Sequence, residues 1–286
     1  MSTDVYPPRA GLSDVSTEIR PLRMLHTSDV HLGAYTSQPW KTERDGSESL
    51  EPALNAFKHV LELGVEANVD VVAIAGDFFD HVRVKRPYVE VTGELMEAVG
   101  RPVVVLPGNH DPHMPDGIYQ KFADAFPANV HIIASAEGEL VLLEEHGVQF
   151  WGQAHESYND FSPASAMPAW ANGSDQYVWR VAMAHGYYVG TGESRYSYQI
   201  HSSEIQSLGA DYVALGHIDV HEGVGDGTVP AYYPGAPRHS GGATIVDFSA
   251  DGVVVRHELH DGAESDPQTA MDRTTRKSIR IAFQLA

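Results

Sequence analysis

Short apolar runs that end in glycine or in a polar residue recur along the chain and predict buried strands. They occupy residues 23–28, 70–75, 102–106, 177–184 and 211–215. Because these runs are continuously apolar rather than alternating, they are typical of strands that are covered on both faces. Apolar residues at helical spacing over 50–65 and over 87–99 predict two helices between the first three strands. The sequence therefore predicts βαβ units and a parallel sheet.

Weaker patterns predict further elements and the limits of the domain. We expect a short helix after Asp116, a helix over 202–208 and more β structure near 130–133, 139–144, 148–151, 232–234, 243–248 and 253–259. Loops are expected from Asp29 through Trp40 and Gly46, and over 153–176. Residues 1–20 are polar and contain prolines, which predicts a disordered arm, followed by one domain over 21–262 and a tail over 263–286.

Polar side chains follow each of the five apolar runs. The segments are Asp29-Val30-His31, Gly76-Asp77, Gly108-Asn109-His110-Asp111, His185-Gly186 and Gly216-His217-Ile218-Asp219. Since the carboxyl ends of parallel strands meet at one edge of a sheet, we expect these side chains to converge. Each segment alone also fits a structural role, as a turn or a packed histidine, but the ordered set predicts a shared site.

The residue types in these segments are those of a site for two metal ions. Carboxylate, imidazole and amide groups are ligands for manganese, iron or zinc. A bridging ligand needs two oxygens and a negative charge, which Asp77 supplies. Two ions about 3.5–4 Å apart flank a phosphoryl centre, so the set predicts hydrolysis of a phosphoester. His110 can protonate the leaving oxygen, because an imidazole changes its charge near neutral pH.

Composition narrows the classes of protein that fit. The chain has no cysteine, so its metal ligands must be nitrogen and oxygen atoms. The formal net charge of −20 argues against a broad basic surface for nucleic acid. The N-terminus lacks an apolar signal segment, and no run of about 18 apolar residues occurs. A cytoplasmic protein that does not act in a membrane is therefore predicted.

Basic residues and histidines near the motif segments offer weaker candidates for contact with substrate. The sequence leaves open that a small positive funnel is formed by basic residues in or near the motif loops, namely Lys41, Arg44, Arg83, Lys85, Arg86 and Arg238. For the basic residues at 83–86, a solvent-exposed position at the start of a helix is at least as good an interpretation as contact with phosphate. The histidines near motif loops are His113, His155, His221 and His239.

The order and wording of the five segments resemble the calcineurin-like metallophosphoesterase superfamily, whose motifs run DxH, GD, GNH(D/E), H and GHxH. The resemblance covers roughly residues 23–240. It implies an α/β fold, a four-layer sandwich in which two mixed β-sheets are flanked by helices and the ligands lie on loops at one end. It also implies a metal-dependent phosphoric ester hydrolase that binds two divalent metal ions.

Carried onto this chain, the resemblance assigns Asp29 and His31 to the first metal and Asp77 to both metals. It assigns Asn109, His185 and His217 to the second metal, His110 to acid catalysis and Asp111 to the orientation of the His110 ring. The chain departs from the family pattern at Asp219, where GHxH has its second histidine. A carboxylate there can still bind the first metal and favours manganese or iron. The alternatives are a weak first site or His221 in this position.

Within the superfamily, residues 24–33, 75–80 and 233–238 are most similar to the SbcD-type DNA repair exonucleases. We therefore expect a phosphodiesterase that acts on a nucleotide or on nucleic acid such as DNA, with manganese favoured over iron or zinc. A phosphatase or cyclic-nucleotide phosphodiesterase acting on a small molecule is the alternative, and a metal-loaded binding module without catalysis is the second. A homodimer, an ATPase partner and the role of the basic tail are left open.

Overall fold

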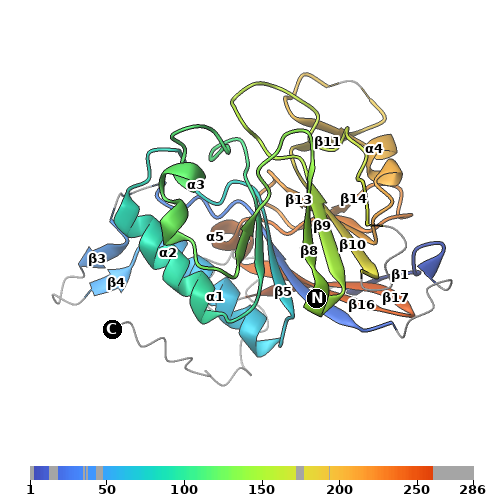
Figure 1. Ribbon diagram of the computed structural model, residues 1–286, viewed down its shortest axis with the longest axis horizontal. Helices are drawn as coiled ribbons and strands as arrows, with labels where there is room; N and C mark the ends of the chain where they lie inside the picture. The colour runs from blue at the N-terminus through green and yellow to red at the C-terminus, as the bar shows by residue number, and fades with distance from the viewer. Residues whose placement is uncertain are drawn as a thin grey trace.

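Two β-sheets face each other in the computed structural model, and helices cover their outer faces (Figure 1). The structure describes residues 3–12, 19–34, 36, 38–42, 48–171, 177–192 and 194–259. The predicted tail over 263–286 and Arg44 of the positive funnel therefore lie outside the described residues.

The larger sheet has parallel strands at one side and antiparallel strands at the other. In spatial order, the described strands are β1 (Thr3–Tyr6), β17 (Gly252–Leu259), β16 (Gly242–Ser249), β2 (Leu22–Thr27), β5 (Val71–Ala75), β6 (Val103–Leu106) and β7 (Val130–Ile132). Strands β2, β5, β6 and β7 run parallel, as the βαβ pattern predicts. Strand β16 is antiparallel to both β2 and β17, so the sheet is mixed.

The second sheet is also mixed. Its described strands, in spatial order, are β14 (Glu222–Val224), β15 (Ala231–Tyr233), β13 (Tyr212–Gly216), β10 (Trp179–His185), β9 (Val148–Gly152) and β8 (Glu139–Leu143). The four central strands are parallel, and the two outer strands are antiparallel to their neighbours. Parallel strands therefore end at the same edge in this sheet, as they do in the larger one.

Helices and two small sheets complete the described part of the chain. The helices are α1 (Pro52–Glu66), α2 (Arg86–Ala98), α3 (Ile118–Lys121), α4 (Ser202–Ser207) and α5 (Pro237–Ser240), with 3-10 turns η2 (Ala123–Ala125) and η3 (Glu144–His146). The small sheets pair β3 (Trp40–Thr42) with β4 (Glu48–Leu50) and β11 (Tyr187–Gly190) with β12 (Gln199–His201).

Three apolar layers separate the four layers of the fold. In β5, Val72 and Ile74 pack against α1 and α2, whereas Ala73 and Ala75 pack against the second sheet, because side chains alternate along a strand. Both faces of this strand are thus buried, which explains its continuous apolar sequence. On the outer face of the second sheet, α4 and Trp170 cover β10 and β13. The long segment that begins at residue 153 is therefore part of the packing, and the four-layer sandwich is confirmed.

The N-terminal segment differs from the predicted disordered arm. Strand β1 pairs antiparallel with β17 and forms the edge of the larger sheet. Leu12 is buried in the layer between the sheets, and Arg9 Nε lies 3.0 Å from Asp211 Oδ1. The prediction is therefore wrong for residues 3–12. The prediction fails because β1 is stabilised by pairing with a strand about 250 residues later in the chain. A segment held in this way need not show a local periodicity in its own sequence.

One predicted loop contains a short strand, and three other short strands were not predicted. The stretch predicted as loop from Asp29 onward includes β3, whose Trp40 pairs with Leu50. Strands β11, β12 and β14 were not predicted either. Strands of three or four residues are too short to show a period, so only their partners reveal them.

His26 is a buried polar side chain of β2 that joins the two sheets. Its Nδ1 lies 3.0 Å from the Tyr212 hydroxyl, and the ring has no exposed surface. Burial, helped by the nearby His221, lowers the pKa of His26 from its usual 6.5 to about 3. The folded protein therefore holds this imidazole neutral where the unfolded chain would protonate it.

We expect His26→Phe to reduce the loss of stability in acid. Between pH 6.5 and 3, unfolded His26 binds a proton that folded His26 does not, so the free energy of unfolding falls as the pH falls. This group alone accounts for at most about 1.4 kcal/mol per pH unit. Urea unfolding of both proteins in EDTA at several pH values measures the difference. Parallel loss of stability in parent and variant would contradict the assignment.

Candidate metal centre

The predicted motif segments converge where the parallel strands of the two sheets end. Asp29 follows β2, Asp77 follows β5 and Asn109 follows β6, all in the larger sheet. His185 ends β10 and His217 follows β13 in the second sheet. The two edges are bound together, because the His217 N–H donates to the Asp29 carboxylate at 2.9 Å and the His185 ring lies 2.9 Å from the Ala75 carbonyl.

The glycines of the motifs are required by this close packing. A Cβ atom on Gly76 would lie 2.1 Å from His185 Nδ1, and one on Gly108 would lie 2.2 Å from Asp77 Oδ1. At Gly216 it would lie 1.7 Å from the Ala75 carbonyl oxygen. Each glycine thus gives room for a proposed ligand or for the backbone that carries it. The recurring sequence of apolar run, glycine and polar residue has this packing as its physical cause.

Four proposed ligands have backbone conformations that side chains rarely adopt. The φ angles are 53° at Asp29, 51° at His31, 48° at Asp77 and 108° at His217. Such conformations cost of the order of 1–3 kcal/mol each and persist where the surroundings impose them. Their concentration in these loops indicates a site whose geometry is selected for function rather than for stability.

Donor atoms form three groups, of which two share one carboxylate and the third joins His31, Asp80 and His110. Donor atoms of Asp29, His31 and Asp77 lie within 4.8 Å of one another, and the same holds for Asp77, His185 and His217. Asn109 Oδ1 lies 3.1 Å from His185 Nε2, so the amide joins the second group. The arrangement can hold two cations with Asp77 between them.

The ring tautomers of two histidines suit a metal. His185 Nδ1 donates to the Ala75 carbonyl, and His31 Nδ1 lies 3.1 Å from Asp80 Oδ1. Since both partners are hydrogen-bond acceptors, each Nδ1 carries a hydrogen, and Nε2 is the ring atom that would bind a metal. Histidine ligands of metals usually have such a partner on the far nitrogen. The residues therefore fit a pair of divalent metal ions.

The charges of the buried groups also favour cations at this place. Burial raises the pKa of Asp29 to about 6, against the opposing effect of His185. Burial alone would raise the pKa of Asp77, but His185, His110 and His31 hold it well below its usual range. Burial alone would lower the pKa of His185, yet Asp77 and Asp29 raise it to about 9. A proton on His185 thus balances the carboxylates, which is the role that a bound cation would fill.

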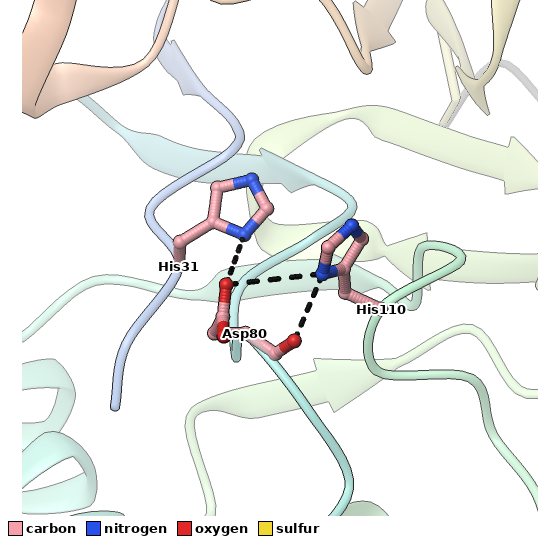
Figure 2. A group of neighbouring side chains, drawn as sticks. All are labelled: His31, Asp80 and His110. Carbon is pink, nitrogen blue, oxygen red and sulfur yellow. Dashed lines mark hydrogen bonds and ion pairs between the residues drawn. The ribbon is translucent and has the colours of Figure 1, made fainter. Parts of the chain in front are cut away.

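His110 is oriented by Asp80 (Figure 2). Its Nδ1 lies 2.9 Å from the Asp80 carbonyl oxygen, which fixes the hydrogen on Nδ1 and leaves Nε2 free to exchange a proton. The side chain is 45% exposed and its ring lies edge-on to that of His31, at 4.8 Å between centroids. His110 can therefore reach a substrate that lies at the donor groups.

Asp111 does not orient the His110 ring, and that prediction is wrong. Its buried carboxylate accepts hydrogen bonds from the Phe79 N–H, the Gly108 N–H and the Tyr119 hydroxyl. Neighbouring residues in a tight turn point in different directions, so Asp111 faces the protein interior while His110 faces solvent. Asp111 instead holds the loop after β6 against the loop after β5.

Asp80 is the site residue that the motif assignment missed. Its carboxylate Oδ1 bonds His31, and its backbone oxygen bonds His110. The available signal was a second acidic residue three positions after Asp77 in Gly76-Asp77-Phe78-Phe79-Asp80. His155 also supports the site, since its Nε2 lies 2.9 Å from the His185 carbonyl, but no local pattern pointed to that contact.

A cavity of about 230 Å³ lies beside the first donor group. Its described lining includes three carboxylates and one guanidinium, from Asp29, Asp80, Asp219 and Arg238, together with His31 and His239. Of the predicted basic funnel, Arg238 thus lies at the site. Arg86 instead pairs with Asp124 and with Glu90, at 2.8 Å for Glu90, which confirms a solvated helix start for that residue.

Asp219 lies in the wall of this cavity but outside the donor groups. Its side chain is exposed, and its backbone oxygen accepts a hydrogen bond from the Ala236 N–H. His221, the alternative ligand, stacks on His257 at 4.3 Å and lies 3.2 Å from the Thr244 hydroxyl. Metal binding by Asp219 therefore remains a prediction, and His221 is held elsewhere.

Substitution of Asp219 tests that prediction. If its carboxylate binds the first metal, Asp219→Ala should weaken the binding of one of the two ions by about tenfold or more. Asp219→His should keep activity and shift the metal preference toward Zn²⁺. Metal titration and activity with Mn²⁺ or Zn²⁺ measure both effects. Two ions bound by Asp219→Ala as tightly as by the parent would contradict the role.

No helix in the described part of the chain combines the length and the apolar character that a membrane crossing needs.

Known proteins resemble the chain in both sequence and fold. It is 26% identical over 219 residues to the uncharacterized metallophosphoesterase YhaO of Bacillus subtilis (strain 168), covering 75% of this chain and 52% of that protein. It is 29% identical over 240 residues to the DNA double-strand break repair protein Mre11 of Methanopyrus kandleri, covering 76% and 49%. Against the D subunit of the nuclease SbcCD of Bacillus subtilis, identity is 28% over 127 residues, covering 43% and 30%. The chain thus spans about half the length of the first two relatives.

A solved structure and a family model agree with these relatives. The crystal structure of TT1561 of Thermus thermophilus matches with a TM-score of 0.52 at 13% identity, over 83% of this chain and 99% of that chain, which shows a shared fold. The model described as calcineurin-like phosphoesterase matches residues 22–221, and this range contains all the donor residues described above. The chain therefore belongs to the calcineurin-like phosphoesterase family, a family of metal-dependent phosphoric ester hydrolases.

Proposed function

We propose that the protein is a dinuclear-metal-dependent phosphodiesterase that acts on a nucleotide or on a nucleic-acid phosphodiester, in the manner of an SbcD-like nuclease. The observation that carries the proposal is the position of Asp77 in two donor groups, with the ring of His110 beside them. Preference for a diester is supported by the relatives named as DNA break repair protein and nuclease subunit.

Each residue has a separate part in this proposal. Asp29, His31 and Asp77 would hold one ion, with Asp219 in addition, and Asp77, Asn109, His185 and His217 would hold the other. When bound, two divalent ions supply positive charge around phosphorus and lower the pKa of bound water. His110 Nε2 gives a proton to the leaving oxygen, since its Nδ1 hydrogen is held by Asp80. Arg238, in the cavity wall, can pair with a phosphoryl oxygen.

We propose manganese as the natural metal. The first donor group combines two carboxylates with a single imidazole, and Asp219 would add a third carboxylate. Oxygen ligands favour manganese relative to zinc, whereas iron and zinc suit the imidazoles of the second group. A cytoplasmic location, a homodimer and an ATPase partner remain proposals from the sequence.

A small-molecule phosphoesterase is the second candidate, and the acidic charge favours it. The net charge of −20 opposes broad binding of a duplex, and three carboxylates line the cavity. A phosphatase or cyclic-nucleotide phosphodiesterase would satisfy the same donor groups. A binding module without catalysis is less consistent with the position of His110, because binding alone needs no proton donor.

Hydrolysis of bis(p-nitrophenyl) phosphate after metal stripping tests the proposal. We expect turnover with added Mn²⁺ and none in excess EDTA, because the carboxylates and imidazoles cannot replace the charge of the ions. Comparison with p-nitrophenyl phosphate and with single- and double-stranded DNA separates the candidate functions. Full activity in EDTA would exclude a metal-dependent mechanism, and inactivity on every substrate with Mn²⁺ would favour the binding module.

A further inference from the structure

Three tyrosines gather beside His217, at the second donor group. Tyr187 belongs to β11, which directly follows β10 and His185, and its ring centroid lies 6.0 Å from that of His217. The Tyr198 ring lies 6.3 Å from His217, with the two ring planes at 84°. Tyr196 stacks on Tyr187 at 4.1 Å and 19°. The rings form an aromatic wall, defined here as Tyr187, Tyr196 and Tyr198.

The wall is accessible to a ligand. Tyr196 is 49% exposed, and Tyr187 and Tyr198 are half-buried. Since Tyr196 and Tyr187 stack face to face, each ring covers one face of the other, and the outer faces of the pair are left for a ligand. None of the three rings belongs to the buried apolar layers of the sandwich. Folding of the core therefore does not explain why these large rings occupy this place.

Tyr198 is held in a conformation that bulky residues rarely adopt. Its φ is 56°, and its N–H donates to Asp160 Oδ1 at 2.7 Å. Its ring packs edge-on against His155 at 4.6 Å, and His155 in turn bonds the His185 carbonyl. A strained tyrosine that is locked to the support of a proposed ligand indicates that the position of this ring matters for what binds at the site.

An acidic group beside the wall indicates which part of a substrate it would accept. Asp160 accepts a hydrogen bond from the Tyr198 N–H at 2.7 Å. This carboxylate repels a phosphate chain, so a row of phosphates is disfavoured there. A flat, neutral, π-rich group is suited to such a surface, and base–aromatic stacking is tolerant of sequence.

We propose that the aromatic wall stacks against an unpaired nucleobase next to the scissile phosphate, so that the enzyme acts on nucleotides and single-stranded ends rather than on intact duplex. This inference rests on the proposed function and names the substrate class of the same site. A base pair inside a duplex cannot present its face to the rings without leaving the stack, which makes the interior of a duplex the poorer substrate.

Two esters with the same leaving group isolate the contribution of the base. The p-nitrophenyl esters of thymidine 5′-phosphate and thymidine 3′-phosphate carry a base, and methyl p-nitrophenyl phosphate does not. We measure the ratio of kcat/KM for the better thymidine ester to that for the methyl ester. For Tyr196→Ala and Tyr187→Ala, this ratio should fall by about tenfold, within the roughly 5- to 150-fold range expected for one stacked base.

Matched variants distinguish stacking from a structural role. Tyr196→Phe and Tyr187→Phe keep the ring face and should keep the ratio. Trp40→Ala removes an aromatic ring that is 37% exposed on β3, on the opposite side of the molecule from β11 in Figure 1, and should leave the ratio unchanged. An equal loss on thymidine and methyl esters in the tyrosine variants would overturn the proposal.

Binding measured without turnover keeps the test independent of the proposed function. A phosphorothioate-linked thymidine tetranucleotide should bind the Mn²⁺-loaded parent more tightly than a closed circular duplex does, because a closed circle exposes no terminal base. Tyr196→Ala should raise its Kd by about tenfold, and Trp40→Ala should not. An unchanged Kd in Tyr196→Ala would overturn the aromatic wall, whereas tight binding without hydrolysis of any ester would overturn only the proposed phosphodiesterase activity.

Discussion

Asp77→Asn protein is expected to lose detectable turnover and to bind both metal ions weakly. Asp77 is the carboxylate that the two donor groups share, so its charge and its two oxygens serve both ions. An amide has one coordinating oxygen and no charge, and it cannot bridge in the same way. Because the ions provide several kcal/mol of transition-state stabilisation, the expected loss of kcat is about 10³-fold or more. Metal analysis and activity with Mn²⁺ measure both effects.

Asp29→Asn is the matched control for this prediction. Asp29 belongs to one donor group, and it also accepts the backbone N–H of His217 at 2.9 Å, which an amide oxygen can still accept. We therefore expect this variant to lose mainly one ion and to keep its fold. Two tightly bound ions in an active Asp77→Asn protein would show that Asp77 does not bridge.

His110→Ala should keep its metals and lose the ability to protonate a poor leaving group. The ring lies outside the two groups that share Asp77, so its removal leaves those donors in place. Loss of an acid catalyst typically costs about 10²–10⁴-fold in rate. The loss should be large for a dinucleotide, whose alkoxide needs a proton, and smaller for bis(p-nitrophenyl) phosphate. Steady-state rates on both substrates and metal content test this expectation.

Asp80→Ala provides a sharp comparison with His110→Ala. His110 Nδ1 lies 2.9 Å from the backbone oxygen of Asp80 and 3.8 Å from its Oδ1, whereas His31 Nδ1 lies 3.1 Å from that Oδ1 (Figure 2). Removal of the carboxylate should thus weaken binding of the metal that His31 would hold and keep the shorter bond that orients His110. An equal rate loss across leaving groups in His110→Ala, or loss of metal from that variant, would rule out the acid role.

Local patterns in the sequence were sufficient for the central strands and for the residue types of the site. The predicted runs over 70–75 and 102–106 correspond to β5 and β6, and the helices over 50–65 and 87–99 correspond to α1 and α2 within a few residues. These elements are buried on a regular face, so their periodicity is visible without partners. Glycine before a polar residue marked the places where side chains from the two sheets approach each other.

Contacts between distant segments decided the remainder. Strand β1 depends on β17, the direction of Asp111 depends on the loop after β5, and Asp80 joins two histidines that lie 79 positions apart by their numbers. Tyr187, Tyr196 and Tyr198 likewise gather beside His217 only because β11 begins where β10 of the second sheet ends. The sequence by itself determined which chemical groups are present and which strands carry them. Only the tertiary structure decided which groups face one another, because side-chain direction in loops is set by non-local packing that no local period records.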